Sequence, residues 1–210
     1  MEPQALVYSE LPFNISFARL PWNALNAQIS AASGFQSMTW LSGLDNSVTA
    51  GVCGFDSLQA AQHFCTEILP EIGQSFGVGQ MARIFDALVV REASKDIQSP
   101  YFGNPAKLRP GAFVYTEVQA NVPFNQAPWR ERNATLKTVG GLISKTWLSG
   151  LHTNTIGGID AFDTLENAKA FAIETFPKTA KSMNAAFYTR VFDATSTEAA
   201  SRNVHSPFYK

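Results

Sequence analysis

The 210-residue sequence contains no apolar run long enough to cross a membrane, which takes about 20 residues. Its first residues, Met-Glu-Pro-Gln, have neither the basic stretch nor the apolar stretch of a secretory signal peptide. Cysteine is scarce, because only Cys53 and Cys65 occur, too few for a disulfide scaffold. We therefore expect a cytoplasmic protein that does not bind membranes.

An excess of charge of either sign is also missing. Lys and Arg number 16 against 17 Asp and Glu, for a net charge of −1. Nucleic-acid-binding surfaces need a basic excess, so we expect no nucleic-acid partner. Charged residues make up only 16% and hydrophobic residues 45%, a balance that excludes intrinsic disorder and allows a large core.

The strongest feature present is an internal repeat. The segment Thr-Trp-Leu-Ser-Gly-Leu at 39–44 recurs at 146–151, an offset of 107 residues. The same offset, without a gap, relates 3–103 to 110–210, and over a third of the aligned positions are identical. Such self-similarity indicates two copies of one unit of ordinary domain size. We expect a first unit at 1–97, a linker at 98–111 and a second unit at 112–210.

Each copy is predicted to contain four strands and two helices. The strands are expected at about 5–12, 35–42, 49–55 and 82–88, and at 112–120, 142–149, 156–162 and 189–195. The first helix ends at Gly34 or Gly141, and the second begins at Asp56 or Asp163 with a capping-box spacing. This β-α-β-β-α-β order predicts an α+β fold of two tandem ferredoxin-like units.

A four-stranded sheet with both helices on one face leaves its other face open. Two such faces can bury one another, which predicts an intramolecular dimeric α/β barrel, a pseudo-dimer within one chain. Further homo-oligomers remain open. Ser-Pro followed by two aromatics occurs at both 99–102 and 206–209, and we expect each of these tails to dock across the other half.

Strand alternation predicts a polar set on the open face of the second copy. Its members are Tyr115, Glu117, Lys145, Trp147, Asp160 and Phe162, and the first copy keeps Tyr8, Glu10, Trp40 and Phe55 but has Met38 and Cys53 in place of Lys145 and Asp160. Polar groups there are costly unless they line a cavity, so we expect the working pocket in the second half.

Structural roles compete with functional ones at these positions. Trp40 and Trp147 could be core aromatics, and Lys145 with Asp160 an interface ion pair. Glu117 could act as a base or pair with an arginine. His152 could be a general base or a solvated turn residue. The three histidines occupy non-equivalent places without metal-ligand spacing, so no metal site is predicted.

The second unit also carries a family pattern. It runs through Gly141-Leu-Ile-Ser-Lys-Thr-Trp147, then Gly157-Gly158-Ile159, Phe162, Ala168 and Val191-Phe192-Asp193. Over about 80 residues this resembles the YdhR-like monooxygenase family of the dimeric α+β barrel superfamily. The first unit keeps Trp40, Gly51, Phe55 and Phe85-Asp86 but lacks the lysine and one glycine.

The resemblance implies a cofactor-independent monooxygenase acting on a small aromatic, quinol or polyketide-like substrate with dioxygen. An acidic phenol or enol would lose a proton in the barrel cavity, and its carbanion would react with oxygen. On this reading Glu117 or His152 is the base and Lys145 the oxyanion partner. Substrate contacts would come from six residues: Trp147, Phe162, Tyr115, Asp160, Trp40 and Tyr8.

Three other functions stay open. A cofactor-free isomerase, cyclase or decarboxylase could use the same base without oxygen. A non-catalytic protein could bind a small molecule with the same polar groups. A haem-dependent member is disfavoured because no histidine is well placed as a proximal ligand.

Overall fold

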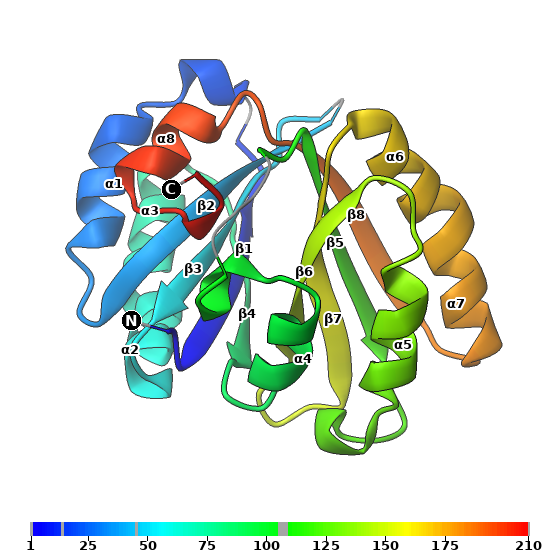
Figure 1. The fold of residues 1–210 in the computed structure, drawn as a ribbon. Helices are drawn as coiled ribbons and strands as arrows, with labels where there is room; N and C mark the ends of the chain where they lie inside the picture. The colour runs from blue at the N-terminus through cyan, green and yellow to red at the C-terminus, as the bar shows by residue number, and fades with distance from the viewer. Residues whose placement is uncertain (1, 14, 45, 105–108, 210) are drawn as a thin grey trace.

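The computed structural model describes residues 2–13, 15–44, 46–104 and 109–209, and it consists of two similar halves (Figure 1). The first half contains β1 Ala5–Leu11, α1 Trp22–Ser30, β2 Phe35–Gly43, β3 Thr49–Phe55, α2 Leu58–His63, α3 Leu69–Ser75 and β4 Met81–Asp86. The second contains β5 Ala112–Gln119, α5 Trp129–Leu136, β6 Leu142–Ser149, β7 Thr155–Phe162, α6 Leu165–Ala170, α7 Phe176–Ser182 and β8 Phe187–Asp193.

All eight strands belong to one antiparallel sheet in the order β4-β1-β3-β2-β8-β5-β7-β6. Each half has the ferredoxin-like order, as predicted. The halves join where β2 pairs with β8, at Ser42–Asp193 and Gly43–Phe192. Between the edge strands, the described backbone is joined by a bridge at Phe85–Gly150 and a hydrogen bond from Leu151 N–H to Ile84 C=O. The sheet is therefore not closed by a continuous ladder, which falls short of the predicted barrel.

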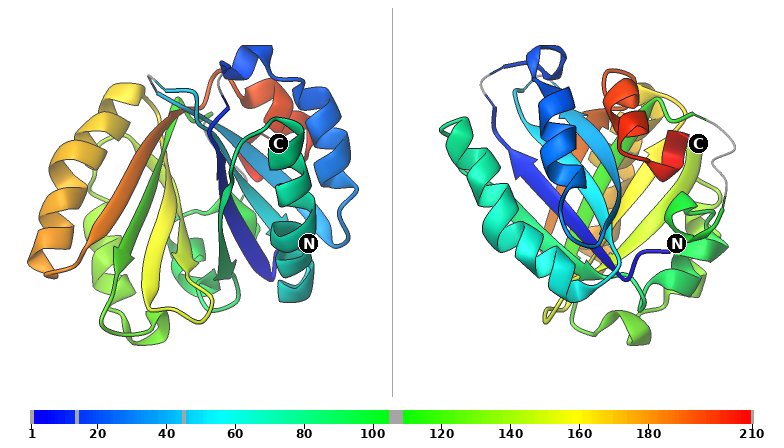
Figure 2. Two further views of the ribbon diagram at one scale, coloured as in Figure 1. Left: turned by 180° about the vertical axis from the view of Figure 1, so that it is seen from behind. Right: turned by 90° about the vertical axis from the view of Figure 1, so that its left-hand side faces the viewer.

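Helices cover the outside of the molecule and the two half-sheets face one another inside (Figures 1 and 2). Strands β1 and β7 are consequently buried on both faces along their whole length, whereas β4 and β8 are only partly covered. At the centre the rings of Tyr8 and Tyr115 stack in parallel, with centroids 3.8 Å apart. The interior thus brings together side chains from both halves.

The second helix of each half begins one residue later than predicted. Ser57 and Thr164, and not Asp56 and Asp163, are the N-caps; their hydroxyls accept the N–H of Ala60 and Asn167 at 3.2 Å. In both halves a turn of π-helix follows, Phe64–Ile68 (η2) or Phe171–Thr175 (η5), before the helix continues as α3 or α7.

The first helices end earlier than predicted, at Ser30 and Leu136, and Gly34 and Gly141 lie in the turns that follow, directly before β2 and β6. Both glycines adopt a positive φ, +73° and +76°, which glycine tolerates best. A Cβ on either would also collide with the side chain of the aspartate that precedes the N-cap of the second helix. Short 3-10 turns, Phe17–Arg19 (η1) and Phe124–Gln126 (η4), lead into α1 and α5.

Two further helices, which the sequence analysis did not predict, follow the last strand of each half. Helix α4, Arg91–Asp96, packs on β6 and α5 of the second half, and α8, Glu198–Asn203, packs on β2 and α1 of the first (Figure 1). Ser94 Oγ accepts the N–H of Trp147, and Ser201 Oγ accepts the N–H of Trp40. Each half therefore contributes one helix that packs on the other half.

The two aromatic tails follow these helices as 3-10 turns, Pro100–Phe102 (η3) and Pro207–Tyr209 (η6). All four rings are buried, which confirms that part of the prediction. The serines reach across, since Ser99 bonds to Thr146 and Ser206 to Thr39. The rings lie at the boundary and also contact their own half: Tyr101 O–H donates to Val52 C=O.

The predicted linker is partly folded, because it contains η3. Its residues 105–108 lie outside the described residues. In the portion that is described, no helix has the length and apolar character needed to span a membrane.

Candidate functional site

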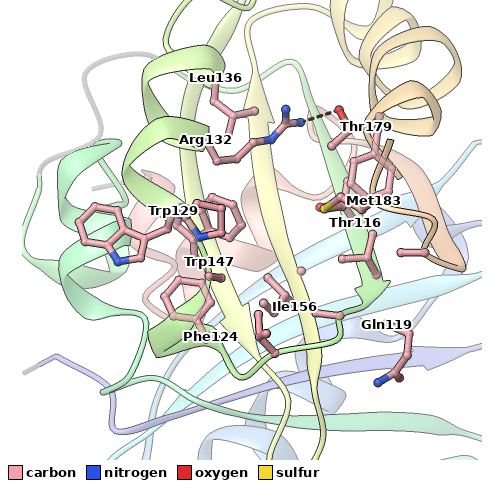
Figure 3. Close-up of a pocket in the computed structure, with 18 of the residues that line it drawn as sticks. Thr116, Gln119, Phe124, Trp129, Arg132, Leu136, Trp147, Ile156, Thr179 and Met183 are labelled. Atoms are coloured by element: carbon pink, nitrogen blue, oxygen red, sulfur yellow. Dashed lines mark hydrogen bonds between the residues drawn. The ribbon is translucent and has the colours of Figure 1, made fainter. Parts of the chain in front are cut away.

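A cavity of about 220 Å³ lies in the second half, between its helices and the helix-facing side of its strands (Figure 3). It exceeds the roughly 150 Å³ apolar cavity that can hold benzene and falls below the ~300–1,000 Å³ of sites for larger ligands. Its size suits one substituted ring. The described lining includes Thr116, Phe124, Trp129, Arg132, Leu136, Lys145, Trp147, Ile156, Phe171, Phe176, Thr179 and Met183.

Trp147, on β6, forms a fixed wall of this cavity. Its indole N–H donates to Asn133 Oδ1 at 2.8 Å, and its ring meets the edge of Phe124 at 5.7 Å between centroids. Asn133 is held in turn by donating to Ala93 C=O on α4. A buried aromatic fixed at both ends is preorganised to contact a flat ligand.

Lys145, also on β6, lines the cavity and forms a buried ion pair. Its Nζ lies 2.8 and 2.9 Å from the two carboxylate oxygens of Asp160 on β7, and 4.6 Å from the centroid of the Trp147 ring. Thr116 Oγ1 also donates to the Asp160 carboxylate. Burial lowers the pKa of Lys145, and the attraction of Asp160 opposes that shift.

Gly158, from the Gly-Gly-Ile segment, makes room for this lysine. A Cβ at Gly158 would collide with Lys145 Nζ and Cε, and a Cβ at the equivalent Gly51 would collide with Met38 Cε. In both halves the glycine pairs with the tryptophan of the neighbouring strand and leaves space for the long side chain two residues before that tryptophan.

Arg132, on α5, is the second cationic residue of the lining. Its Nη2 donates to Thr179 Oγ1 on α7 at 2.9 Å (Figure 3). Thr179 in turn donates to Thr175 C=O. Burial lowers the pKa of Arg132, and Asp160 opposes that shift. The ion pairs found among the described residues do not include this guanidinium.

The same place in the first half is filled with apolar side chains. Phe13 and Phe76 pack edge to face there with centroids 4.7 Å apart, where the second half has Ala120 and Met183. Leu25, Met38 and Cys53 replace the three charged residues and belong to the buried core. Loss of two phenyl rings and gain of three charges together distinguish the cavity from its filled counterpart.

Of the predicted site residues, two line this cavity: Lys145 and Trp147. Asp160 lies directly behind Lys145, completely buried. Phe162 packs on Phe171 beneath the cavity and is not part of its lining.

The other predicted site residues lie elsewhere. His152 is exposed in the turn between β6 and β7, with a φ of 57°. Trp40 is the wall residue of the filled first half, its indole N–H bonded to Asn26. Tyr8, Tyr115 and Glu117 lie between the two half-sheets, on the opposite face of the strands from the cavity.

The prediction that all six polar and aromatic residues share one face is wrong. Alternation fixes the faces within a strand, but the register between strands decides which sets coincide. Asp160 pairs with Val114 and with Lys145, so these three share the helix-facing side. Tyr115, one residue further along β5, points to the other side.

The tyrosine pair between the half-sheets belongs to an ion-pair network. Tyr8 O–H donates to Glu10 and Tyr115 O–H to Glu117. The carboxylates pair with arginines of the opposite half: Glu117 with Arg83 at 2.9 Å and Glu10 with Arg190 at 3.4 Å. Burial raises the pKa of both tyrosines. Glu117 thus has the arginine partner that was its structural alternative.

Sequence reasoning missed Arg132 and Thr179. A signal was present, because aligning the two halves sets them against Leu25 and Ile72, two aliphatic residues. Strand alternation could not find it, because these two residues lie on the helices α5 and α7.

No family model matches this sequence, and no curated protein does. Among solved structures, the chain is similar to an anthrone oxidase-like protein, with a TM-score of 0.53 and 14% identity over 92% of each chain. It is also similar to a monooxygenase-like protein from Listeria innocua, with a TM-score of 0.51 and 11% identity over 91% of this chain and 94% of that one. The chain therefore shares the α+β fold of these proteins; identity this low shows the fold alone.

Proposed function

We propose that this protein is a cofactor-independent monooxygenase that oxidises a small aromatic or quinol substrate in the cavity of the second half. The observation that carries the proposal is a cavity of about 220 Å³ with aromatic walls and two cations, Arg132 and Lys145. Among the described residues that line it, none is a histidine or a carboxylate. Such a site favours a flat ligand that becomes an anion.

The cations would supply the electrostatic part of the reaction. A positive charge near a bound phenol lowers its pKa and stabilises the phenolate, which is the form that reacts with oxygen. The phenolic proton leaves to water at the cavity mouth. Lys145 contributes less than its charge suggests, because Asp160 already neutralises it at 2.8 Å. Arg132, which is not in an ion pair with any described residue, adds to the positive potential of the cavity.

The overall reaction needs no external reductant. For a hydroquinone, one atom of dioxygen converts a ring C–H into C–OH. The other atom leaves as water with the two hydroxyl hydrogens that the quinol loses. The product is a hydroxyquinone. The walls formed by Trp147 and Phe124 would orient the ring and keep bulk water away from the anion.

We also propose that the halves are tandem copies of a YdhR-like unit that pair as an intramolecular dimeric α/β barrel. The constant offset of 107 residues supports duplication, and the bridge at Phe85–Gly150 supports pairing of the edge strands. Chains cut between the copies should associate as a heterodimer; two independent monomers in solution scattering would argue against the barrel.

Oxygen consumption tests the enzymatic proposal. The purified chain, treated with a chelator, is incubated with hydroquinone or with 2,5-dihydroxybenzoate in isotopically labelled oxygen. We expect saturable uptake above autoxidation and one labelled atom in the product. The matched control is Ala120→Phe/Met183→Phe, which rebuilds the filled interior of the first half. Equal uptake by both proteins, or turnover that continues without oxygen, would refute the proposal.

A further inference from the structure

The charges around the cavity do not balance. Lys145, Arg132 and Asp160 act on one another electrostatically, and they amount to two cations and one carboxylate. Both oxygens of Asp160 are taken by Lys145, at 2.8 and 2.9 Å. Among the described residues this leaves the guanidinium of Arg132 without an anionic partner.

Arg132 cannot shed its own charge by losing a proton, and Asp160 is held by Lys145 and not by Arg132. A buried lysine can become neutral, whereas arginine stays charged at any ordinary pH. A charge that is partly withdrawn from water is stabilised by a counter-ion. Arg132 is half-buried, and its planar fork of N–H donors matches a carboxylate in a two-point contact.

Arg132 and its hydrogen-bond partner Thr179 both differ from the residues at the equivalent positions of the first half. Thr179, which accepts one of its N–H groups at 2.9 Å, stands where the first half has Ile72, and Arg132 stands where it has Leu25. The hydroxyl holds the guanidinium at the cavity while the other N–H donors of Arg132 have no described protein acceptor. A solvated surface arginine needs no such paired change.

We infer that Arg132 is a specificity-determining residue that selects aromatic substrates bearing a carboxylate. The carboxylate binds the guanidinium beside Thr179, and the ring lies against Trp147, as the cavity of about 220 Å³ allows. That the ligand is a substrate rests on the proposed function. That the site prefers a ligand with a carboxylate does not depend on it.

Benzoate and benzamide test the inference, because they have nearly the same shape and differ in charge. Titration calorimetry should show that the protein binds benzoate at least about tenfold more tightly, as expected for a hydrogen bond to a charged group. Arg132→Leu, which copies the first half, should abolish that preference. Arg132→Lys should retain part of it, because the charge remains without the fork.

Two outcomes overturn the inference: equal affinity of the unaltered protein for both probes, or a preference for benzoate that survives Arg132→Leu. The preference is a ratio within one protein, so a general loss of stability does not imitate it. Ala120→Phe/Met183→Phe should abolish binding of both probes, which places them in the cavity. If the preference holds and no oxygen is consumed, the inference stands and the monooxygenase proposal falls; oxygenation without the preference has the opposite meaning.

Discussion

The two halves share a frame and differ in what it encloses. In both, a tryptophan on the second strand is fixed by an asparagine on the first helix, at 2.7 Å for Trp40–Asn26 and 2.8 Å for Trp147–Asn133. Behind that wall one half is solid with aromatic and aliphatic side chains, while the other has a cavity and charged residues. The frame therefore serves stability, and the residues behind the wall decide whether a ligand fits.

The largest expected effect concerns the buried ion pair, which the first half lacks. Asp160→Cys leaves the ammonium of Lys145 unpaired, so unfolding free energy should drop by about 3–5 kcal/mol. The double variant Lys145→Met/Asp160→Cys, which copies the first half, should recover most of the loss in urea unfolding experiments. A double variant as unstable as the single one would show that the halves are not interchangeable here.

The opposite single change, Lys145→Met, should also be destabilising, although Met38 occupies the equivalent position of the first half. The single change would leave the carboxylate of Asp160 buried without its cation, so folding needs the second substitution as well.

The next effect tests the shared frame. Asn26→Ala and Asn133→Ala each leave a buried indole N–H without its acceptor, a loss of about 1–3 kcal/mol in unfolding free energy. We expect similar losses in the two variants by thermal or urea unfolding. Benzamide binding should weaken only in Asn133→Ala; equal weakening in both would mean that the cavity does not hold the ligand.

A smaller effect is expected from the tail that ends in η6. Deleting residues 205–210 removes the buried rings of Phe208 and Tyr209 and the bond from Ser206 to Thr39 of the other half. A loss of about 1–2 kcal/mol should lower the melting temperature by several degrees. An unchanged melting temperature in calorimetry would show that the tail does not stabilise the boundary between the halves.

A last effect, which is absent at neutral pH, is a symmetric one at the tyrosine pair. Burial raises the pKa of Tyr8 and Tyr115 above the ordinary value near 10. Above about pH 10 the unfolded chain loses these protons and the folded chain keeps them, so stability falls as pH rises, by about 1.4 kcal/mol per pH unit for each tyrosine.

Tyr8→Phe and Tyr115→Phe should each reduce that slope by the same amount. Urea unfolding at about pH 9 and about pH 11 measures it. A slope that changes in only one variant would show that the two sides of the stacked pair differ in solvent access.

The strands and the first helices could be predicted because every signal appears twice. Gly34 with Gly141 and the paired hairpins at 35–55 and 142–162 support each other. The face of the sheet to which each side chain points could not be predicted. Alternation separates the two faces within β5 or within β6, but only the register, which pairs Val114 and Lys145 with Asp160, shows which residues of the two strands share a face. Helices α4 and α8 were missed because they are short, six residues each, and are stabilised by contacts with the opposite half.

The helix α8 and the strand β8, which contact the first half, are among the last segments to be synthesised. Domains emerging from the ribosome tend to fold from the amino terminus onward. The partner of β2 is β8, and the partner of the Trp40 backbone N–H is Ser201. These partners become available only after some 160 further residues have been translated. The nascent first half must therefore carry an uncovered strand edge, a surface prone to intermolecular pairing, through most of elongation.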